Sequence, residues 1–261
     1  MYFFLYDSFL SDKRYEKALA RIEARVADLG IKGRVVKLTI LQQLEETIKE
    51  AIDRGAKTVV AVGNDKTISG AIAILAGYKH VTLGIIPVGE ENEIAKILGI
   101  PEEELACDVI SNRLIDILDV GRINEQYFFK EVRVEDEGLV LECDGRYKIK
   151  PKEVEEIVIY NFGYNDDKKI NPKDGALELM IKPKIKKNEG LFSMFKKKQR
   201  ELDSVFINRF IRITSLLKDE KGSGIKEKFI NIDGIRKMKT PATITVAGKR
   251  LKVIVGKERL F

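Results

Sequence analysis

Two short apolar runs constrain the fold of this chain more than any other feature. Residues 58–62 read Thr-Val-Val-Ala-Val, residues 83–88 read Leu-Gly-Ile-Ile-Pro-Val, and a helical pattern follows each run directly. Runs that are apolar at nearly every position are typical of parallel strands that are buried on both faces. We therefore expect residues 63–67 and 87–92 to form strand-to-helix turns, where α/β sheets usually bind ligands.

The same alternation of strand and helix patterns extends back to the first residue. Residues 2–6 and 34–38 have the composition of strands, and amphipathic helical patterns span Tyr15 to Leu29 and Leu41 to Ile52. A glycine follows each helical pattern, as expected at a helix end. This order predicts a parallel sheet with helices on both sides.

The pattern changes after about Asp119. The later apolar segments are short, β-branched or aromatic, and they are separated by Asp-Gly, Asn-Pro and Gly-Ser turns. We therefore expect an α/β plus all-β fold, with a parallel α/β domain at 1–119 and an antiparallel β-sandwich at 120–250. The boundary should fall near residues 120–121, and one sheet continuing through both halves would contradict this division.

Composition indicates a cytoplasmic globular protein. Of the 261 residues 34% are charged, and no apolar run approaches the roughly 20 residues that cross a bilayer. Residues 1–5 are too short for the apolar region of a signal peptide and lack a basic lead. The separated Cys107 and Cys143 and the single His80 suggest neither a disulfide framework nor a zinc site.

The positive charge is concentrated in one segment. The chain has a net charge of +6, but residues 182–200 contain eight basic residues and one acidic residue, a net of +7 that leaves −1 elsewhere. A local basic segment argues for one anionic contact and against a surface that coats nucleic acid.

Two loop sequences carry a family resemblance. Residues 63–67 read G-N-D-K-T and residues 87–93 read P-V-G-E-E-N-E, and they resemble the G-G-D-G-T and P-x-G-T-x-N-D-x-A loops of diacylglycerol kinase-type lipid kinases. Residues 98–101, 117–124 and 170–178 are similar to three further family motifs in the same order. The resemblance implies an NAD kinase-like α/β domain followed by a β-sandwich, with a tail at 251–261 that returns to the first domain.

The resemblance also implies a nucleotide site, with ATP and magnesium as cofactors if the protein is active and none otherwise. The implied nucleotide-binding residues are Gly63, Asn64, Asp65, Lys66, Thr67, Gly89, Glu90 and Asn92. Two of the three loop glycines are replaced, and glycine is what lets backbone amides approach a phosphate closely. Glu90 and Glu91 would face the triphosphate, and one such contact at 4 Å costs about 4 kcal/mol at an effective dielectric constant near 20.

Other interpretations of these loop residues stay open. Lys66 could be an exposed residue in the first turn of a helix, and Glu90 and Glu91 could be favourable charges at a helix N-terminus. Asp65 could cap the helix that follows it. Lys66 could also form an ion pair with Glu90 or Glu91, which would fill the vacated phosphate site with protein.

The implied catalytic and metal positions are altered too. Residues 232–235 read Ile-Asp-Gly-Ile where the family has an Asp-Gly-Glu turn whose glutamate is the general base, and Ile235 accepts no proton. Asp233 is then the candidate catalytic residue, or only part of a turn. Asp174 is the candidate magnesium ligand, or part of a hairpin turn. The N-P-x-x-G phosphate loop is also missing after the first strand, where Asp7 begins Asp-Ser-Phe.

The basic segment suggests membrane contact. Within 184–198, four apolar residues stand between two lysine-rich arms, a composition suited to an anionic membrane surface. The candidate contact residues are Lys186, Lys187, Phe192, Phe195, Lys196, Lys197 and Lys198. Alternatively, the segment is a hairpin whose tip packs on its own domain or on a second subunit in a homodimer.

These observations give two functional hypotheses. In the first, the chain is a lipid kinase-like protein in which phosphoryl transfer is impaired or lost, and it acts as a binding or regulatory module on the inner face of a membrane. In the second, it is a working ATP-dependent lipid kinase that phosphorylates a lipid hydroxyl with altered phosphate loops. Saturable binding of Mg-ATP distinguishes the second from the first.

Overall fold

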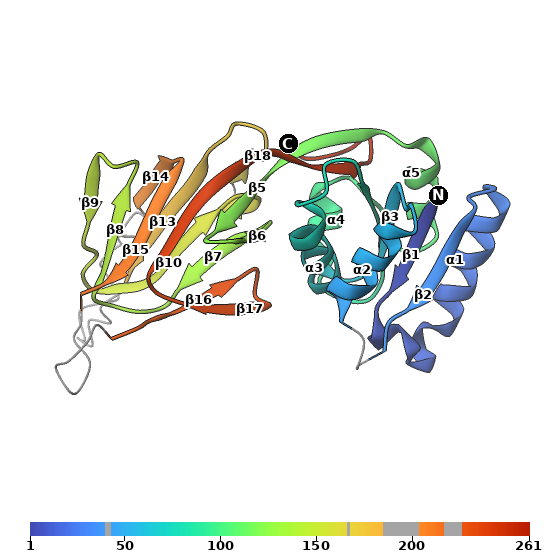
Figure 1. The fold of residues 1–261 in the computed structure, drawn as a ribbon, viewed down its shortest axis with the longest axis horizontal. Helices are drawn as coiled ribbons and strands as arrows, with labels where there is room; N and C mark the ends of the chain where they lie inside the picture. The colour runs from blue at the N-terminus through green and yellow to red at the C-terminus, as the bar shows by residue number, and fades with distance from the viewer. Residues whose placement is uncertain (40–42, 166–167, 185–203, 217–225) are drawn as a thin grey trace, which may run out of the picture.

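The structure is a computed structural model that describes residues 1–39, 43–165, 168–184, 204–216 and 226–261. These residues form an α/β half and a β half that lie side by side (Figure 1). The strands and α-helices of the α/β half are β1 (Tyr2–Tyr6), α1 (Glu16–Asp28), β2 (Gly33–Lys37), α2 (Leu44–Asp53), β3 (Thr58–Gly63), α3 (Asp65–Leu75), β4 (Thr82–Pro87), α4 (Glu93–Ile97) and α5 (Leu105–Asn112). Two short 3-10 helices, η1 (Ser8–Ser11) and η2 (Lys13–Tyr15), follow β1.

The predicted α/β architecture is confirmed. The strands are parallel in the order β2-β1-β3-β4, and every residue of β3 and β4 is buried. Right-handed crossovers place α1 on one face of this sheet and α2 and α3 on the other. Helix α5 lies beside α1, and α2 lies beside α3. The carboxyl ends of β1, β3 and β4 therefore meet at one edge.

The β half is built from short antiparallel strands. They are β5 (Ile115–Ile123), β6 (Gln126–Phe128), β7 (Glu131–Val134), β8 (Leu139–Cys143), β9 (Tyr147–Ile149), β10 (Val154–Tyr160), β11 (Gly163–Asn165), β12 (Lys168–Ile170), β13 (Leu177–Pro183), β14 (Ser204–Asn208), β15 (Phe210–Ser215), β16 (Phe229–Ile232), β17 (Arg236–Lys239) and β18 (Ala242–Ile254). Six of them form a sheet in the order β14-β13-β10-β7-β16-β17. This sheet packs on a second layer that contains β15, β8 and β9, and Ile157 and Ile159 of β10 share one buried core with Ile211 and Ile213 of β15.

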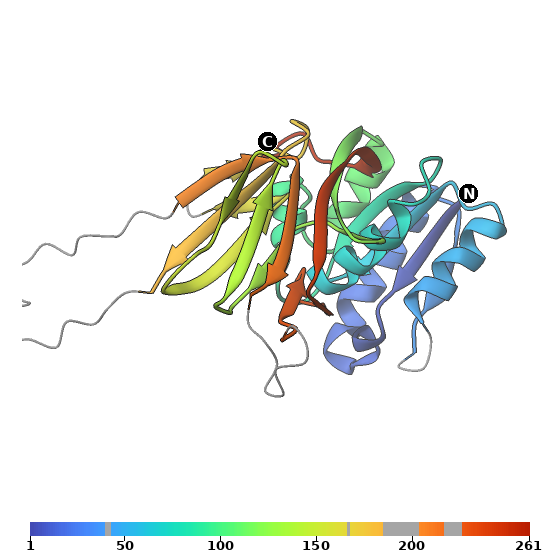
Figure 2. The same ribbon diagram turned by 60° about the vertical axis from the view of Figure 1, so that its left-hand side comes forward.

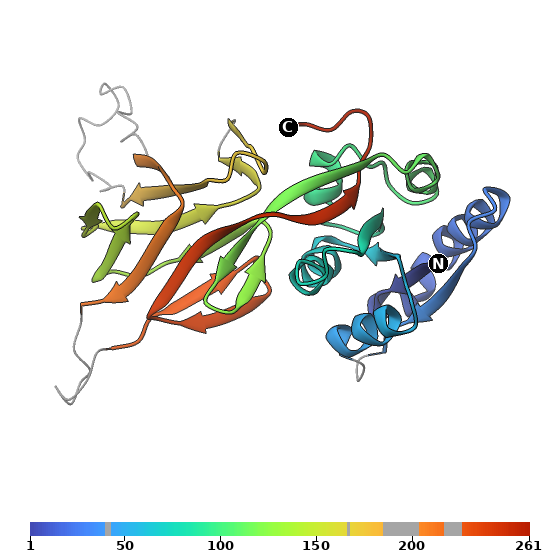
Figure 3. The same ribbon diagram turned by 45° about the horizontal axis from the view of Figure 1, so that its top comes forward.

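The expectation that no sheet passes through both halves is wrong. Strand β18 pairs with β15 in the β half and, through Lys252 and Val253, with β4 in the α/β half. One ten-stranded sheet therefore continues through both halves. Strands β5 and β18 cross between the halves as a long antiparallel ribbon, coloured green and red in Figures 2 and 3.

The sheet continues through both halves because β5 and β18 are long strands. The expected boundary at 120–121 lies inside β5, because apolar residues continue on either side of it. Each half nevertheless has its own buried apolar cluster. The chain therefore has two cores joined by a shared sheet, without a linker at the expected position.

The C-terminal residues lie against α4. The backbone N–H of Gly256 donates to Leu98 O, and that of Leu260 donates to Ile97 O, each at 2.8–2.9 Å. A Cβ atom at Gly256 would lie 1.7 Å from Gly99 O, so the two backbones touch here. This packing fixes the end of the chain beside the helix that carries Glu93.

Candidate functional site

The two loops that resemble phosphate loops lie next to each other at the carboxyl edge of the parallel sheet. The N–H of Asp65 donates to Glu91 O at 2.9 Å, and the N–H of Val88 donates to Gly63 O at 3.0 Å. Two segments separated in the sequence are therefore brought together, as the resemblance implied.

Asn64 occupies the N-terminus of α3 with its own side chain. Its Oδ1 accepts hydrogen bonds from the N–H groups of Lys66 at 3.1 Å and Thr67 at 3.5 Å. Asp65 was the expected helix cap, but Asn64 caps the helix instead. Asn is a favoured N-cap residue. A glycine at position 64 would leave both N–H groups free for an anion. Here they are already satisfied by protein.

Gly63 and Thr67 form a tight contact at the start of the same helix. A Cβ atom at Gly63 would lie 2.5 Å from Thr67 Oγ1, so only glycine fits there without a shift. The Thr67 hydroxyl donates to Asp7 Oδ2 at 2.6 Å. The Thr67 hydroxyl is thus already hydrogen-bonded to the carboxylate of Asp7. This carboxylate would repel a phosphate at the same place.

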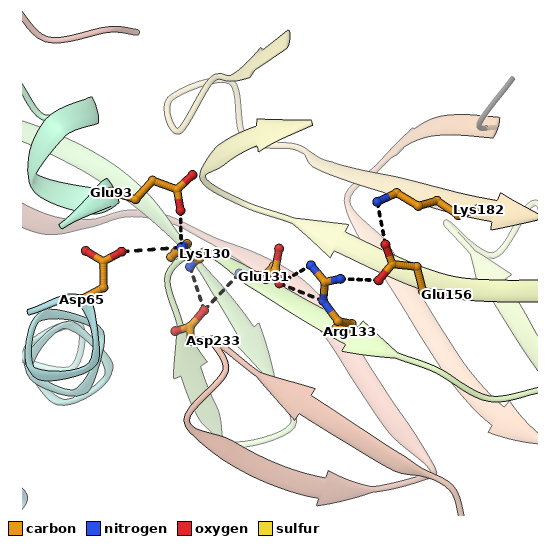
Figure 4. A network of polar contacts seen from close by, with 8 residues as sticks. All are labelled: Asp65, Glu93, Lys130, Glu131, Arg133, Glu156, Lys182 and Asp233. Atoms are coloured by element: carbon orange, nitrogen blue, oxygen red, sulfur yellow. Dashed lines mark hydrogen bonds and ion pairs between the residues drawn. The ribbon is translucent and has the colours of Figure 1, made fainter. Parts of the chain in front are cut away.

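Asp65 is the most enclosed acid of the two loops. It is only 8% exposed, and its Oδ1 accepts a hydrogen bond from the N–H of Ile94 at 3.0 Å. Its Oδ2 lies 3.6 Å from Nζ of Lys130, and the same ammonium lies 2.5 Å from Oε2 of Glu93 (Figure 4). Lys130 directly precedes β7, so its ammonium joins the β half to two carboxylates of the α/β half.

Sequence reasoning missed Lys130. The one local signal is a single lysine after the apolar residues 127–129. Burial lowers the pKa of Lys130, but the hydrogen bond to Glu93 and the charges of Glu93 and Asp65 outweigh burial, and the pKa is raised. The lysine therefore remains a cation beside Asp65 and Glu93.

Burial raises the pKa of Asp65 to about 6, although the Ile94 N–H and Lys130 oppose the shift. The folded protein thus binds this proton more tightly than the unfolded chain, whose value is 3.8. Stability contributed by the protonated form is complete below pH 4 and is lost as pH rises to about 6, a difference of about 3 kcal/mol.

We predict that Asp65→Asn flattens this pH dependence. Urea unfolding of wild type and variant at pH 4, 5.5 and 7 should show their difference in stability changing by about 3 kcal/mol in favour of the variant. Asp28→Asn, at an exposed position of α1, is the matched control and should leave the wild-type profile unchanged. Parallel profiles for wild type and Asp65→Asn would contradict the assignment.

The expected ion pair between Lys66 and Glu90 or Glu91 is wrong. All three side chains are exposed, and none of the ion pairs among the described residues includes Lys66. An exposed pair stabilises by only about 0–1 kcal/mol, too little to hold two flexible side chains together. The lysine that pairs with acidic residues of these two loops is instead Lys130, whose partners are Asp65 and Glu93.

Gly89 and Asn92 shape the second loop. Asn92 Nδ2 donates to Gly89 O at 2.8 Å and to Glu102 Oε1 at 3.3 Å. Gly89 has φ +90°, a conformation that glycine adopts without strain. Glu90 between them is exposed. The side-chain contacts of Asn92 are thus made to the backbone of its own loop and to a neighbouring acid.

Asp233 organises the backbone that carries Lys130. Its carboxylate accepts hydrogen bonds from the N–H groups of Phe129 at 2.9 Å, Lys130 at 2.8 Å and Glu131 at 3.0 Å. Burial raises its pKa, and these three donors oppose the shift. Its oxygens are therefore engaged in positioning Lys130. A role for Asp233 as a catalytic base stays a prediction, and Ile235 offers no base beside it.

Asp174 lies in an exposed turn. Its Oδ1 accepts a hydrogen bond from the N–H of Ala176 at 2.9 Å, as in a local Asx turn. Over the part of the chain that the structure describes, no three acidic, histidine or cysteine side chains cluster as a metal site would require. The strands on either side, β12 and β13, do not pair with each other, so Asp174 lies in a local turn and not in a hairpin.

A second group of charges lies next to Lys130 in the β half. Arg133 donates to Glu131 Oε1 at 2.8 and 3.0 Å and also pairs with Glu156, and Lys182 Nζ lies 2.6 Å from Glu156 Oε1 (Figure 4). The chain of ion pairs crosses β7, β10 and β13. It extends from Glu131, the residue after Lys130, to Lys182 near the end of β13.

The candidate membrane-contact residues lie outside the described residues. They are Lys186, Lys187, Phe192, Phe195, Lys196, Lys197 and Lys198. The strands that flank them, β13 and β14, are antiparallel neighbours with Ile181 opposite Ser204. Among the helices that the structure describes, none is long and apolar enough to cross a membrane.

The fold, an α/β half followed by a β half, is that of solved diacylglycerol and NADH kinases. A solved diacylglycerol kinase from Bacillus anthracis aligns with 99% of this chain and 97% of its own, with a TM-score of 0.74 and 17% identity. A yeast NADH kinase complexed with NADH aligns with 100% of this chain and 85% of its own, with a TM-score of 0.57 and 9% identity. At these identities the likeness concerns the fold alone.

Sequence comparison finds relatives over part of the chain. Residues 1–123 match the model of the diacylglycerol kinase catalytic domain. A diacylglycerol kinase of Bacillus subtilis is 33% identical over 117 residues, which are 44% of this chain and 39% of the relative, and a probable lipid kinase of Cronobacter sakazakii is 38% identical over 87 residues, 31% of this chain and 29% of the relative. The matches thus span well under half of these relatives. Over its α/β half the chain is therefore similar to the diacylglycerol kinase catalytic domain.

Proposed function

We propose that this protein is a lipid kinase-like module that has lost ATP-dependent phosphoryl transfer and binds anionic lipid surfaces on the cytoplasmic side of a membrane. The observation that carries the first part is the state of four backbone N–H groups at the helix starts. Those of Lys66 and Thr67 donate to Asn64, that of Asp65 to Glu91, and that of Ile94 to Asp65.

A triphosphate needs free donors and positive charge at this place. The four N–H groups are engaged, and the ammonium of Lys130, which lies beside these helix starts, is already shared by Asp65 and Glu93. The exposed Glu90 and Glu91 add negative charge to the second loop. The residues present therefore do not fit Mg-ATP.

The alternative is a working ATP-dependent lipid kinase. It is favoured by the family match of residues 1–123 and by the presence of Asp65, Asn92 and Asp233 at family positions. It requires Lys130 to release both carboxylates and requires a general base in place of Ile235. The contacts that the structure describes provide neither of these changes. We therefore favour the protein that has lost phosphoryl transfer.

Sequence supports the lipid-surface part of the proposal. Residues 182–200 carry a net charge of +7 around four apolar residues. In addition, residues 1–123 match the catalytic domain of diacylglycerol kinases, whose substrate is a lipid. Lysines near an anionic membrane each contribute about 1 kcal/mol, and apolar side chains add interfacial binding.

We predict that the protein co-sediments with anionic vesicles in the absence of nucleotide and that Mg-ATP does not change the bound fraction. Binding should fall steeply with added salt and with loss of anionic lipid, because exposed charges are screened. Deleting Lys196 to Lys198 should weaken it strongly, and replacing Phe192 and Phe195 by serine should weaken it even at low salt. Vesicles of phosphatidylcholine alone are the control. Absence of wild-type binding to anionic vesicles at low salt would contradict the lipid-surface role.

A further inference from the structure

A groove lies between α4, α5 and the chain after β18. It begins beside Asn92 and Glu93 and extends to residues 112–114 at the end of α5. The chain after β18 runs between the ends of the two helices (Figure 3), since the N–H of Val255 donates to Leu114 O and that of Gly256 to Leu98 O. The volume of the groove is about 1270 Å³, enough for a small molecule, whose sites usually have roughly 300–1,000 Å³.

Much of the lining of this groove is apolar. Its apolar side chains include the buried Ile100 and Val255 and the partly exposed Val109, Leu114 and Leu260. Backbone N–H groups of the lining are already bonded to carbonyl oxygens of this chain, namely those of Gly99, Ile100, Val255, Gly256 and Leu260. An extended peptide would leave its own backbone groups unpaired against such a lining, which is costly. An acyl chain has no polar groups along its length, so the lining favours an acyl chain.

The charge at the rim of the groove that is left to meet a ligand is positive. Three acidic residues line the groove. Glu93 is paired with Lys130, and Glu102 accepts a hydrogen bond from Asn92 Nδ2 at 3.3 Å, whereas Glu258 has no such partner among the described contacts. Three basic residues also line the groove, and no ion pair among the described residues includes any of them: Lys96, Arg113 and Lys257. The groove therefore combines an apolar lining with cations that have no carboxylate partner there.

We propose that this groove binds a long-chain fatty acid. The acyl chain lies along the apolar lining, and the carboxylate lies beside Lys96 and Lys257, which are exposed and stand next to the contact between Gly256 and Leu98. A cationic head would be repelled by the same lysines. The inference does not rest on the proposed membrane contact, which concerns residues 182–200.

Isothermal titration of the full chain with dodecanoate, below the concentration at which it forms micelles, tests this proposal. The wild type should bind one dodecanoate per chain saturably. Butyrate, which has the carboxylate but little chain, should show no saturable binding, because it has little apolar surface to bury. Dodecyltrimethylammonium, which has the same chain and a cationic head, should bind at least about tenfold more weakly than dodecanoate.

Variants of the lining make the titration specific. Leu114→Asp and Lys257→Glu, tested separately, should each weaken dodecanoate binding at least about tenfold, because one places a charge in the apolar lining and the other reverses a charge at the rim. Leu105→Asp, at a 60% exposed position of α5 outside the groove, and Lys32→Glu, at an exposed position before β2, are the matched controls and should bind like the wild type.

Circular dichroism verifies that each variant is folded, and both target side chains are exposed enough to accept the change. Deleting Lys196 to Lys198 should leave dodecanoate binding unchanged although it weakens vesicle binding, so this proposal and the proposed function fail separately. Absence of saturable dodecanoate binding, equal binding of the cationic amphiphile, or an affinity that neither lining variant changes would each overturn the proposal. Loss of binding in the deletion variant would also overturn it, by placing the ligand on the basic segment.

Discussion

Replacing Lys130 by methionine should lower the free energy of unfolding at pH 7 by about 2–3 kcal/mol. The substitution removes the shared ammonium and leaves the carboxylates of Asp65 and Glu93 close together without a cation between them. Loss of one partner of a fully buried pair costs about 3–5 kcal/mol, and the lower value is expected because Glu93 is 44% exposed at its side chain. Urea unfolding at pH 7 measures the difference.

Two variants make this measurement specific. Adding Asp65→Asn to Lys130→Met should recover at least half of the loss, since the most buried uncompensated charge is then removed. Lys66→Met, at an exposed position without an ion pair among the described contacts, should change stability by less than about 0.5 kcal/mol. Equal stability of Lys130→Met and the wild type would show that the bridge between the halves has no energetic role.

The second large effect is a gain of nucleotide binding. We expect the combined variant Asn64→Gly, Lys66→Gly, Glu90→Thr and Glu91→Gly to bind Mg-ATP at least tenfold more tightly than the wild type. Asn64→Gly frees two N–H groups at the start of α3, and the glutamate changes remove charge that repels phosphate. Glu91 already has φ +62°, so glycine fits its backbone.

The gain should exceed that of any single change, because all four positions lie around one site and their effects are coupled. Lys66→Gly alone is the matched control, since Lys66 is exposed and its removal frees no donor. Thermal melts of every variant exclude loss of folding as a cause. A combined variant that binds no better than the wild type would show that the loops are not what excludes nucleotide.

The α/β half and the meeting of the two loops could be predicted because both depend on local patterns. The runs at 58–62 and 83–88, apolar at nearly every position, specify buried parallel strands, and adjacent parallel strands bring their following loops together. The length of β18 could not be predicted this way. A register shift between Ala247 and Leu251 interrupts its alternation, so the sequence shows a short strand followed by a separate tail.

The adjacency of the two loops was predicted, but the interactions of their side chains were not. Lys130 comes from the other half of the chain, and the packing of the two halves determines its partners, so the sequence around Lys130 does not identify them. Asn64 did carry a local signal, since it stands at the favoured cap position directly before the helix. The expected pair at Lys66 failed because opposite charges in adjacent loops attract too weakly when both are exposed.

Isothermal titration of the wild-type chain with ATP and magnesium tests the central claim most directly. The engaged N–H groups and the shared ammonium of Lys130 predict no saturable heat at nucleotide concentrations up to the millimolar range. Saturable binding of Mg-ATP in the micromolar range, at one nucleotide per chain, would contradict the account and would favour a working lipid kinase.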